Sequence, residues 1–385
     1  MKSKNYLILD FANLAAILRF GLINKNADTL LMDDEQWKNY FLDSILVNIA
    51  NYINVLGADE VIITVESKSW RKTYYPLYKA NRDKDKEEDE KLELFYEAQN
   101  LALDFLKDFT HIKVIKVDEA EGDDIVAVLT QKLSLEGHKV TIVSTDGDFK
   151  QLLKHKNVKI FNPIKKVYLN EGYSHRDYIE KIIKGDRGDN IPSSYPRIKK
   201  ELLDQFANDE RSIEDEFKRN EKMMERQKFF IAKFLGVEEI PEDFTEEEWF
   251  ETIKLAKEKK DELKEEVKKA KEWNEFKDDP ELVERYENLR KILKLAKSEG
   301  FTESTLFKEP IHFRSGFERN KKLISLDIEV LPEHVVDNII KEFEKDHKPT
   351  KQGEYLKFVR SHKLKEFAFG NEWNILKSVG KDNDE

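Results

Sequence analysis

The chain has 385 residues, of which 38% are charged and 39% are hydrophobic, and it contains no cysteine. At roughly 150 residues per domain this length suggests two or three structural units, and the missing cysteine excludes disulfides, zinc–thiolate sites and thiol nucleophiles. No run of about 18 apolar residues is present and Asp10 interrupts the apolar start of the chain, so we expect no membrane span, no signal peptide and a cytoplasmic location.

The net charge of −11 argues at first against a nucleic-acid partner. The negative charge is concentrated, however, because residues 209–300 alone hold 21 Lys/Arg and 28 Asp/Glu. The local distribution of charge decides whether a protein has a phosphate-binding face. The acidic total therefore does not exclude an enzyme that acts on nucleic acid.

Short apolar runs alternate with helical patterns over the first 190 residues. Strands are predicted at 6–9, 61–65, 112–117 and 140–143, and helices at 37–56 and 92–106. Buried strands that alternate with helices indicate a mostly parallel sheet with helices on both faces. We therefore expect an α/β domain over residues 1–175.

The remainder of the chain has a helical character. A helix, a polar turn at 186–192 and a second helix are predicted between 178 and 206. Residues 212–299 form long Lys/Glu-rich helices, broken near 236–241 and 278–280, which indicate a charged insertion, either a hairpin, a bundle or a coiled coil. We expect a helical domain at 176–211 and 300–376, the insertion between them, and a flexible tail at 377–385.

Nine acidic side chains from five segments are predicted to meet at one edge of the sheet. Some directly follow strands, and parallel strands present their carboxyl ends, where ligands bind, at the same edge. The others open a helix at 121–124 or lie in the polar turn, where they could equally be ordinary caps. The nine are Asp10, Glu66, Glu121, Asp123, Asp124, Asp146, Asp148, Asp186 and Asp189.

Nine converging carboxylates repel one another unless cations neutralise them. A ligand set made only of oxygen, without Cys or His, indicates Mg²⁺, with Mn²⁺ as a substitute. So many acids suggest two ions, the arrangement used for phosphodiester hydrolysis.

A phosphate substrate also needs cations from the protein, and residues 74–82 (YYPLYKANR) supply them after Arg71. We expect Lys79 and Arg82 to share a helical face, with Lys79 stabilising the transition state and Arg82 gripping a phosphate. Tyr75 or Tyr78 could stack an unpaired base. The simpler alternative is an amphipathic surface helix.

The motifs in chain order are Asp10, YKANR at 78–82, EGDD at 121–124, STDGDFKQL at 144–152 and GDRGDNIP at 185–192. Their order and spacing resemble the 5′-nuclease superfamily, which comprises the flap endonucleases and the 5′→3′ exonuclease domains of bacterial polymerases. The segment ERNKKLISLDIEVLPEHV at 318–335 is similar to the phage branch, the T-even ribonuclease H enzymes that remove RNA primers. The resemblance extends over residues 1–207 and more loosely over 309–345.

The resemblance implies a PIN-like nuclease fold with an arch near 70–100, which would include the charged run at 83–91, and a helix–turn–helix-type motif that binds duplex. It implies that Asp124 serves either of two metal sites or holds a water there, and that Lys79 and Arg82 act at the scissile phosphate. The implied ligands are Asp10, Glu66, Glu121 and Asp123 for the first ion and Asp146, Asp148, Asp186 and Asp189 for the second.

Further expectations follow from the same resemblance. They are a monomer in the cytoplasm of a phage host, a substrate of flapped, nicked or RNA-primed duplex DNA, and replication partners such as a single-strand-binding protein and a sliding clamp. Residues 365–373 (KEFAFGNEW) are a candidate clamp-binding peptide, and Arg71, Tyr75 and Tyr78 are candidate nucleic-acid contacts.

The sequence departs from the family pattern in three places. Glu66 stands where the family has Asp. The turn after DNIP reads SSYPRIKKELL, without the glycines that let backbone amides, often with K⁺, hold duplex phosphates, so Arg197, Lys199 and Lys200 are expected to bind through their side chains. The insertion at 212–299 has no counterpart in the family and is either a solvated decoration or a docking arm.

These patterns together predict a divalent-metal-dependent 5′→3′ exonuclease or flap endonuclease. One alternative is a flap-DNA-binding or replisome-interaction protein that kept the fold and lost the chemistry, although unpaired buried carboxylates are costly without a function. A haloacid-dehalogenase-like phosphatase is a second alternative, but its D-x-D signature is absent because Phe11, Ala12 and Asn13 follow Asp10.

Overall fold

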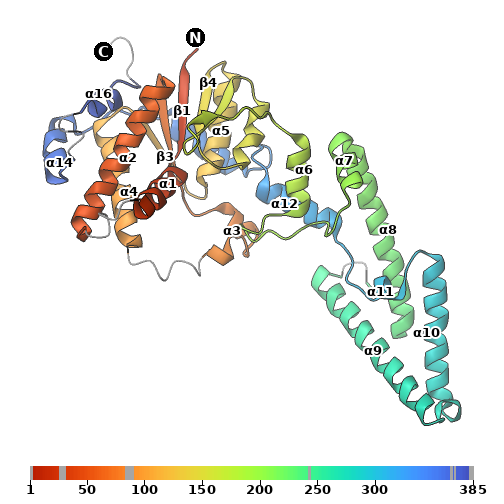
Figure 1. Cartoon of the computed structure of the whole chain (residues 1–385). Coiled ribbons are helices and arrows are strands. Elements are labelled where there is room, and N and C mark those ends of the chain that lie inside the picture. The colour runs from red at the N-terminus through yellow and green to blue at the C-terminus, as the bar shows by residue number, and fades with distance from the viewer. Residues whose placement is uncertain are drawn as a thin grey trace. The chain divides into compact units, whose positions relative to one another are not determined.

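The computed structural model describes residues 3–25, 32–82, 91–241, 244–364, 367 and 370–380 (Figure 1). The chain divides into two compact units. The sheet unit comprises Met1–Tyr178, Asp186–Ile191 and Lys321–Glu385, and the helical unit comprises Ile179–Gly185 and Pro192–Asn320. Most of the predicted charged run and tail, and four residues of the candidate clamp peptide, lie outside the described residues.

A six-stranded sheet forms the centre of the sheet unit, in the order β3-β2-β1-β4-β5-β6. Its strands are β1 (Asn5–Asp10), β2 (Glu60–Val65), β3 (Lys113–Lys116), β4 (Lys139–Val143), β5 (Val158–Asn162) and β6 (Val167–Tyr168). All neighbouring pairs are parallel except β5 and β6. The mostly parallel sheet is thus confirmed, and β5 and β6 are additions to the four strands predicted from sequence.

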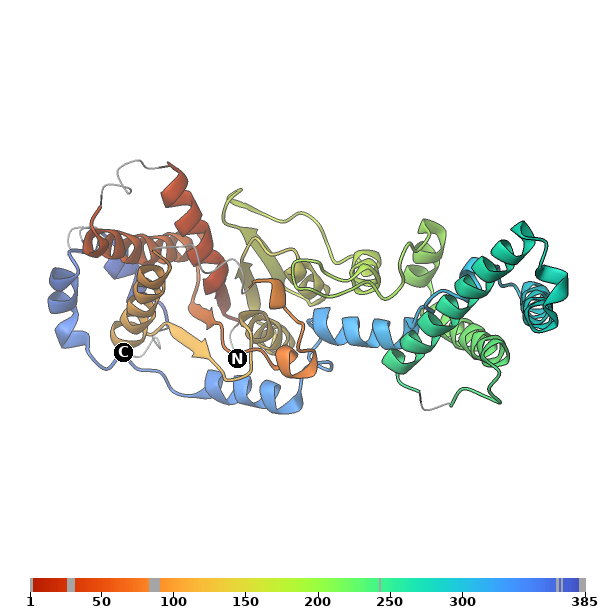
Figure 2. The ribbon, with the colours of Figure 1, turned by 90° about the horizontal axis from the view of Figure 1, so that it is seen from below.

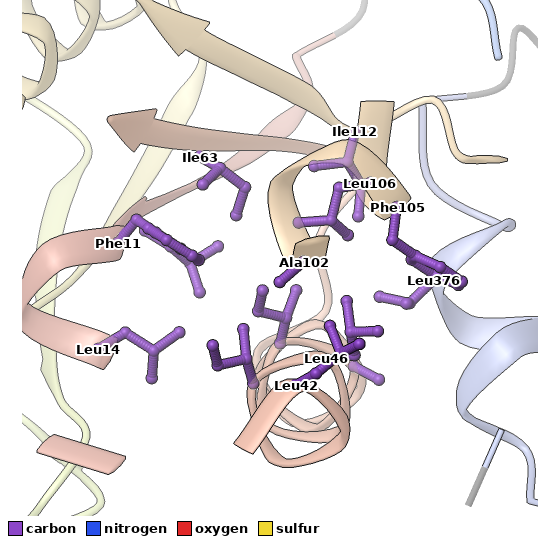
Figure 3. Close-up of a cluster of buried hydrophobic side chains, with 14 of the residues drawn as sticks. Phe11, Leu14, Leu42, Leu46, Ile63, Ala102, Phe105, Leu106, Ile112 and Leu376 are labelled. Atoms are coloured by element: carbon purple, nitrogen blue, oxygen red, sulfur yellow. The ribbon is translucent and has the colours of Figure 1, made fainter. Parts of the chain in front are cut away.

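Alternate residues of the central strands face opposite sides of the sheet, as the two-residue period of a strand requires. Leu7 and Leu9 pack in one core with α1 (Phe11–Lys25), α2 (Asp34–Leu56) and α4 (Leu92–Phe109). Ile8 and Ile62 pack in a second core with α5 (Gly122–Leu135) and α13 (Glu333–Glu344). Figure 3 shows side chains of α1, α2 and α4 gathered with Ile63 and Leu376 in the first core.

Residues Lys321–Glu385 belong to the sheet unit, so of the segment 300–376 that was predicted to be part of the helical domain, only residues 300–320 lie in the helical unit. Tyr355 opens α14 (Tyr355–Ser361), and Leu376 ends α16 (Glu372–Leu376); both are buried in the core formed by α2 and α4. The rings of Tyr355 and Trp373 are stacked 3.9 Å apart. The aromatic residues of this region therefore pack against α2 and α4. A short 3₁₀ helix, η5 (Gln352–Glu354), precedes α14.

The helical unit contains the predicted insertion, and the insertion has a hydrophobic core of its own. The helical unit includes α7 (Lys200–Asn208), α8 (Glu210–Leu235), α9 (Glu246–Glu272), η4 (Phe276–Asp278), α10 (Pro280–Ser298) and α11 (Glu303–Leu306). Trp249, Leu263 and Leu289 are buried where α8, α9 and α10 pack side by side (Figure 2). The region is therefore a packed bundle, one of the three predicted forms.

The breaks between these helices follow from local chemistry. Gly236 ends α8 in the left-handed conformation, with φ of 75°, which glycine adopts without strain. Pro280 opens α10 at a position where its missing N–H is not needed, and Asp279 caps that helix. Two further helices, α6 (His175–Lys184) and α12 (Phe313–Ile324), contribute residues to both units. No helix in the described ranges is long and apolar enough to cross a membrane.

Candidate active site

Three parallel strands end level with one another in the sheet unit. The register pairs Leu9 of β1 with Ile63 of β2 and with Val143 of β4. The carboxyl ends of these strands therefore bring their acids to one edge of the sheet, as predicted from sequence. We call this edge, together with the N-terminus of α5, the acidic edge; its carboxylates are Asp10, Glu66, Glu121, Asp123 and Asp146.

Asp10 is the most deeply placed strand-end carboxylate of the acidic edge. Its oxygens accept hydrogen bonds from the backbone N–H of Asn13 at 3.1 Å and from the hydroxyl of Ser144 at 2.9 Å. Burial, together with the negative charge of Asp146, nevertheless raises the pKa of Asp10 to about 6. The two hydrogen bonds thus hold the Asp10 carboxylate in position, but they offset only part of the cost of burying its negative charge.

Asp123 and Glu66 experience the same repulsion. Burial, followed by the charges of Asp10, Asp146 and Glu66, raises the pKa of Asp123 well above its usual range. Burial and the charge of Glu121 raise the pKa of Glu66 to about 7. Since the charge of Asp146 acts on Asp10 and Asp123, Asp146 is coupled to the predicted first metal group rather than only to the second.

Glu66 lies against the start of α5. A Cβ atom on Gly122 would lie 3.2 Å from Oε1 of Glu66, so the glycine leaves room for the longer side chain that replaces the family's Asp. The backbone N–H of Gly122 also hydrogen-bonds to the Glu66 carboxylate. The Glu at this position is therefore accommodated by the neighbouring glycine of the EGDD motif.

The charges of the acidic edge suit a divalent cation, although the side chains are not arranged as a complete set of metal ligands. The donors are all carboxylate oxygens, the ligand class that hard cations prefer. Repulsion between these carboxylates disfavours the state in which all of them are ionised, and a bound cation would relieve the repulsion. Within the described ranges, however, no three Asp, Glu or His side chains are arranged to hold an ion as they stand. Binding would therefore require side-chain rearrangement.

Arg71 is a structural residue, which corrects its predicted role as a nucleic-acid contact. Its side chain is 2% exposed and lies between Glu121 and Asp124, with Nη1 2.9 Å from Glu121 Oε2 and Nη2 2.8 Å from Asp124 Oδ1. Its Nε donates to the carbonyl of Leu323 at 2.9 Å. The guanidinium therefore ties α3 (Trp70–Tyr74) to α5 and cannot reach a substrate.

Asp124 is equally occupied, which corrects its predicted role at a metal. Its Oδ2 accepts from Arg71 at 3.0 Å, from the indole of Trp70 at 3.2 Å and from the backbone N–H of Glu121 at 3.0 Å. The carboxylate is fully buried and caps the first turn of α5. The cap explanation was therefore correct for Asp124, whereas Asp123 beside it is directed into the acidic edge.

Residues 74–82 do not form the predicted helix. The helix α3 ends at Tyr74, because Pro76 disfavours a helical conformation at the preceding residue, and Lys79 has a left-handed φ of 55°. The resulting turn still brings both cations to the acids. Lys79 Nζ lies 2.5 Å from Glu121 Oε1, and Arg82 forms an ion pair with Asp189.

Tyr78 is buried, which corrects the prediction that it offers a face to a base. Its ring is 3% exposed in a small core with Ile191 and Leu323, and Tyr75 packs against this core. The hydroxyl of Tyr78 donates to Glu121 Oε2 at 3.1 Å. Tyr78 therefore positions Glu121, and of the two predicted stacking residues only Tyr75 retains partial exposure.

The predicted polar turn forms as a closed loop. Backbone hydrogen bonds join Asp186 and Ile191 in both directions, at 3.0 and 2.7 Å. Asp186 Oδ1 accepts from the N–H groups of Gly188 and Asp189, at 2.8 and 3.3 Å, so this carboxylate stabilises its own turn. Asp189 is joined to the acidic edge through Tyr78 and Arg82. Asp148 opens η3 (Asp148–Lys154), and its N–H donates to Asp146 Oδ1 at 2.8 Å.

Sequence reasoning missed two polar residues that support the site. Ser144 holds Asp10, and its hydroxyl also accepts from the N–H of Asp146 at 3.0 Å. Asn13 hydrogen-bonds with Thr145 at 2.8 Å and so ties the start of α1 to the loop after β4. Ser144 lies inside the motif at 144–152, and its position directly after a strand would have been the signal, whereas Asn13 follows Asp10 outside the motifs.

The three basic residues predicted to contact duplex lie in the helical unit. Lys199 directly precedes α7 without a capping hydrogen bond from its side chain, Lys200 begins the helix, and both are exposed, as is Arg197. Arg197 has a left-handed φ of 61°. The turn therefore adopts a glycine-like conformation at Arg197 although the glycines of the family pattern are absent.

Comparisons with known proteins agree with this architecture. Residues 30–182 match the sequence model of the family described as 5′-3′ exonuclease, N-terminal resolvase-like domain. Ribonuclease H of Enterobacteria phage T4 is 35% identical over 192 residues, which cover 48% of this chain and 62% of that protein. Flap endonuclease Xni of Shewanella piezotolerans is 33% identical over 135 residues, which cover 32% of this chain and 48% of the relative.

The chain thus spans about half to three fifths of the length of these relatives. The solved structure of phage T5 5′-exonuclease with bound divalent zinc ions aligns with a TM-score of 0.51 at 18% identity, covering 90% of this chain and all of that chain. That likeness establishes the fold. Over residues 30–182, therefore, the chain is similar in sequence to the family described as 5′-3′ exonuclease, N-terminal resolvase-like domain.

Proposed function

We propose that the protein is a divalent-metal-dependent 5′ nuclease that hydrolyses phosphodiesters near the 5′ ends of flapped, nicked or RNA-primed duplex DNA. The observation that carries this proposal is the mutual repulsion of Asp10, Glu66 and Asp123, whose raised pKa values mark a site that favours bound cations. The names of the relatives, ribonuclease H and flap endonuclease, support the substrate class.

The acidic edge would hold the first cation through Asp10, Glu66, Asp123 and Asp146, the carboxylates whose charges act on one another. Asp148, Asp186 and Asp189 would contribute to a second. Mg²⁺ is the cation of choice for an all-oxygen donor set, and Mn²⁺ would substitute for it. Such ions supply an activated water and neutralise charge on the scissile phosphate.

The protein's own cations would bind the substrate phosphate. Lys79 and Arg82 each form an ion pair with a carboxylate, Glu121 and Asp189 respectively, so both lie beside the predicted metal ligands. With cations bound at the acidic edge, Lys79 would donate to an oxygen of the scissile phosphate, and Arg82 would bind two phosphate oxygens through its guanidinium. Arg71 and Tyr78 would keep Glu121 in place in this arrangement.

Cleavage of a 5′-labelled flap and of a nicked RNA–DNA duplex tests the proposal. We expect short 5′ products with Mg²⁺ or Mn²⁺, none with EDTA, and loss of cleavage in Asp146→Asn. The matched control is Asp104→Asn, which removes an exposed carboxylate of α4 and should leave cleavage unchanged. A wild-type protein that binds the flap but never cleaves it would instead support the binding-protein alternative.

A further inference from the structure

The loop 186–191 belongs to the sheet unit, although the residues on both sides of it belong to the helical unit. It carries Asp186 and Asp189, which are predicted ligands of a second ion. Hydrogen bonds join this loop to the segment 77–82 of the sheet unit, which carries Lys79. The way in which loop and segment are joined therefore decides where the cation lies relative to these acids.

The first connection is made by the backbone of Lys79. Its N–H donates to the carbonyl of Asp189 at 2.9 Å, and its φ of 55° lies in the left-handed region. Its ammonium lies 2.5 Å from Oε1 of Glu121 at the acidic edge. The loop thus holds the residue from which the cation extends, in a backbone conformation that most side chains rarely adopt.

Asn190 makes the second connection. Its side-chain amide donates to the carbonyl of Leu77 at 2.8 Å. Its φ of 57° is also left-handed, and asparagine tolerates that conformation better than most residues other than glycine. Asn190 therefore supplies both the turn of the loop and a donor to the segment. The two contributions can be separated, because glycine keeps the turn and loses the donor.

Asn81 makes a third connection in the opposite direction. Its side-chain amide donates to the carbonyls of Arg187 at 3.1 Å and Gly188 at 3.4 Å. Since a carbonyl oxygen only accepts, each asparagine must direct its NH₂ group to the other piece of chain. Leu77 and Asn81 stand on either side of Lys79 in the sequence, so the two asparagine bonds hold the chain both before and after the lysine.

Two further contacts between loop and segment depend on the carboxylate of Asp189. Arg82 forms an ion pair with it, and the hydroxyl of Tyr78 lies 3.4 Å from its Oδ2. Both contacts compete with any ion that Asp189 binds. The asparagine bonds, in contrast, have only backbone carbonyls as acceptors. They therefore persist when the carboxylates of the predicted ion sites take other partners.

We propose that Asn81 and Asn190 are positioning residues, which fix the segment 77–82 to the loop 186–191 and so hold the ammonium of Lys79 at the acidic edge. This role rests on the proposed function, in which Lys79 donates to the scissile phosphate. Neither asparagine needs to touch the substrate. A displacement of about 1 Å in a group that acts on the reacting atoms can cost about 10²-fold in rate. Loss of either donor therefore slows the chemical step more than it weakens binding of the flap.

The test compares single-turnover cleavage of a 5′-flap duplex in Mg²⁺ with the Kd of the same flap in EDTA, using the full chain. The variants are Asn190→Gly, which keeps the left-handed turn, and Asn81→Ala. The matched control is Asn157→Gly, because Asn157 is also left-handed, with φ of 60°, and its side chain is exposed. We expect the cleavage rate of each variant to fall roughly 10- to 100-fold with a Kd within about 2-fold of wild type, and no change in the control.

A double-variant cycle with Lys79→Met separates positioning of the lysine from general stabilisation of the loop. If Asn190 acts through Lys79, Asn190→Gly should slow cleavage by less than about 3-fold once the ammonium is gone. The same fold-loss with and without the ammonium would overturn the proposal, because Asn190 would then act on something other than Lys79. Unchanged cleavage rates in both single variants would overturn it as well.

Hydrogen exchange in EDTA tests the same contacts without substrate or metal. The amide of Lys79 should exchange at least about 10-fold faster in Asn190→Gly than in wild type and Asn157→Gly, while the amides of β1 keep their protection. Unchanged exchange at Lys79 would overturn the proposal whatever the cleavage rates are. Faster exchange in the variant, together with a wild type that never cleaves, would instead contradict only the proposed nuclease function.

Discussion

Arg71 and Asp124 form a buried, two-pronged ion pair, with Nη1 3.0 Å from Oδ2 and Nη2 2.8 Å from Oδ1. The same guanidinium also holds Glu121. One cation thus neutralises two carboxylates of the EGDD motif and leaves only Asp123 of that motif directed to the acidic edge. The ion pair therefore gives Asp124 a structural role, whereas the adjacent Asp123 remains a candidate metal ligand.

Arg71→Gln should destabilise the protein by about 3–5 kcal/mol, because it leaves the buried carboxylate of Asp124 without its cation, whereas Glu121 keeps its ion pair with Lys79. Urea unfolding followed by circular dichroism measures this loss. Lys107→Gln, which removes an exposed charge from α4, serves as the control and should change stability by less than about 0.5 kcal/mol. Equal stability of Arg71→Gln and wild type would contradict the structural role.

Stability without metal should fall as the pH rises. The pKa of Asp10 is raised to about 6 and that of Glu66 to about 7, so the folded state binds these protons more tightly than the unfolded chain, whose carboxyls titrate near pH 4. The stabilising protonated form is complete below about pH 4 and is lost as the pH rises through 6 to 7. Melting curves in EDTA between pH 5 and 8 measure the decline, which Mg²⁺ should reverse.

The variant Asp123→Asn tests the repulsion between the carboxylates of the acidic edge. Removing one charge from the group should raise the melting temperature at pH 8 in EDTA by at least about 2–4 °C and flatten the pH dependence, while abolishing stabilisation by Mg²⁺. Asp104→Asn should follow the wild-type curve at every pH, since its carboxylate is exposed. A lower melting temperature for Asp123→Asn in EDTA would mean that the carboxylates do not repel one another.

Much of the sheet was predictable because its strands are continuous apolar runs, and their carboxyl ends carry the acids. The strand β5 (VKIFN) escaped prediction because it is short and contains polar residues, so its identity depends on its parallel pairing with β4. Charge alone did not distinguish the buried Arg71 from the partly exposed Lys79, because burial is decided by packing. Pro76 indicates the end of α3, but the prediction of a helix over 74–82 did not take this proline into account.

Lys79→Met should lower the single-turnover cleavage rate by about 10²–10³-fold with a smaller change in Kd for the flap, because the ammonium would act mainly on charge that develops in the transition state. Methionine keeps most of the aliphatic stem but removes the ammonium group, which lies 4.9 Å from the centre of the Tyr78 ring. The control Lys139→Met lies at the amino end of β4, opposite the acidic edge. A large loss of flap binding with an unchanged rate would reassign Lys79 to ground-state binding.

Gly316→Ala should disturb the packing of α12 against the loop 192–197. The added methyl group would lie 3.0 Å from Cβ and 3.1 Å from Cα of Ser194, and the second contact is with backbone that cannot simply rotate away. Overpacking of this kind costs about 1–3 kcal/mol and should displace the loop that carries Arg197, so both stability and flap binding in EDTA should decline. Gly172→Ala, where nothing lies within 4 Å of the new Cβ, is the matched control. If Gly316→Ala loses stability while its flap affinity and salt slope match wild type, the loop tolerates displacement, and the contribution of Arg197 to binding does not depend on the close contact between α12 and Ser194.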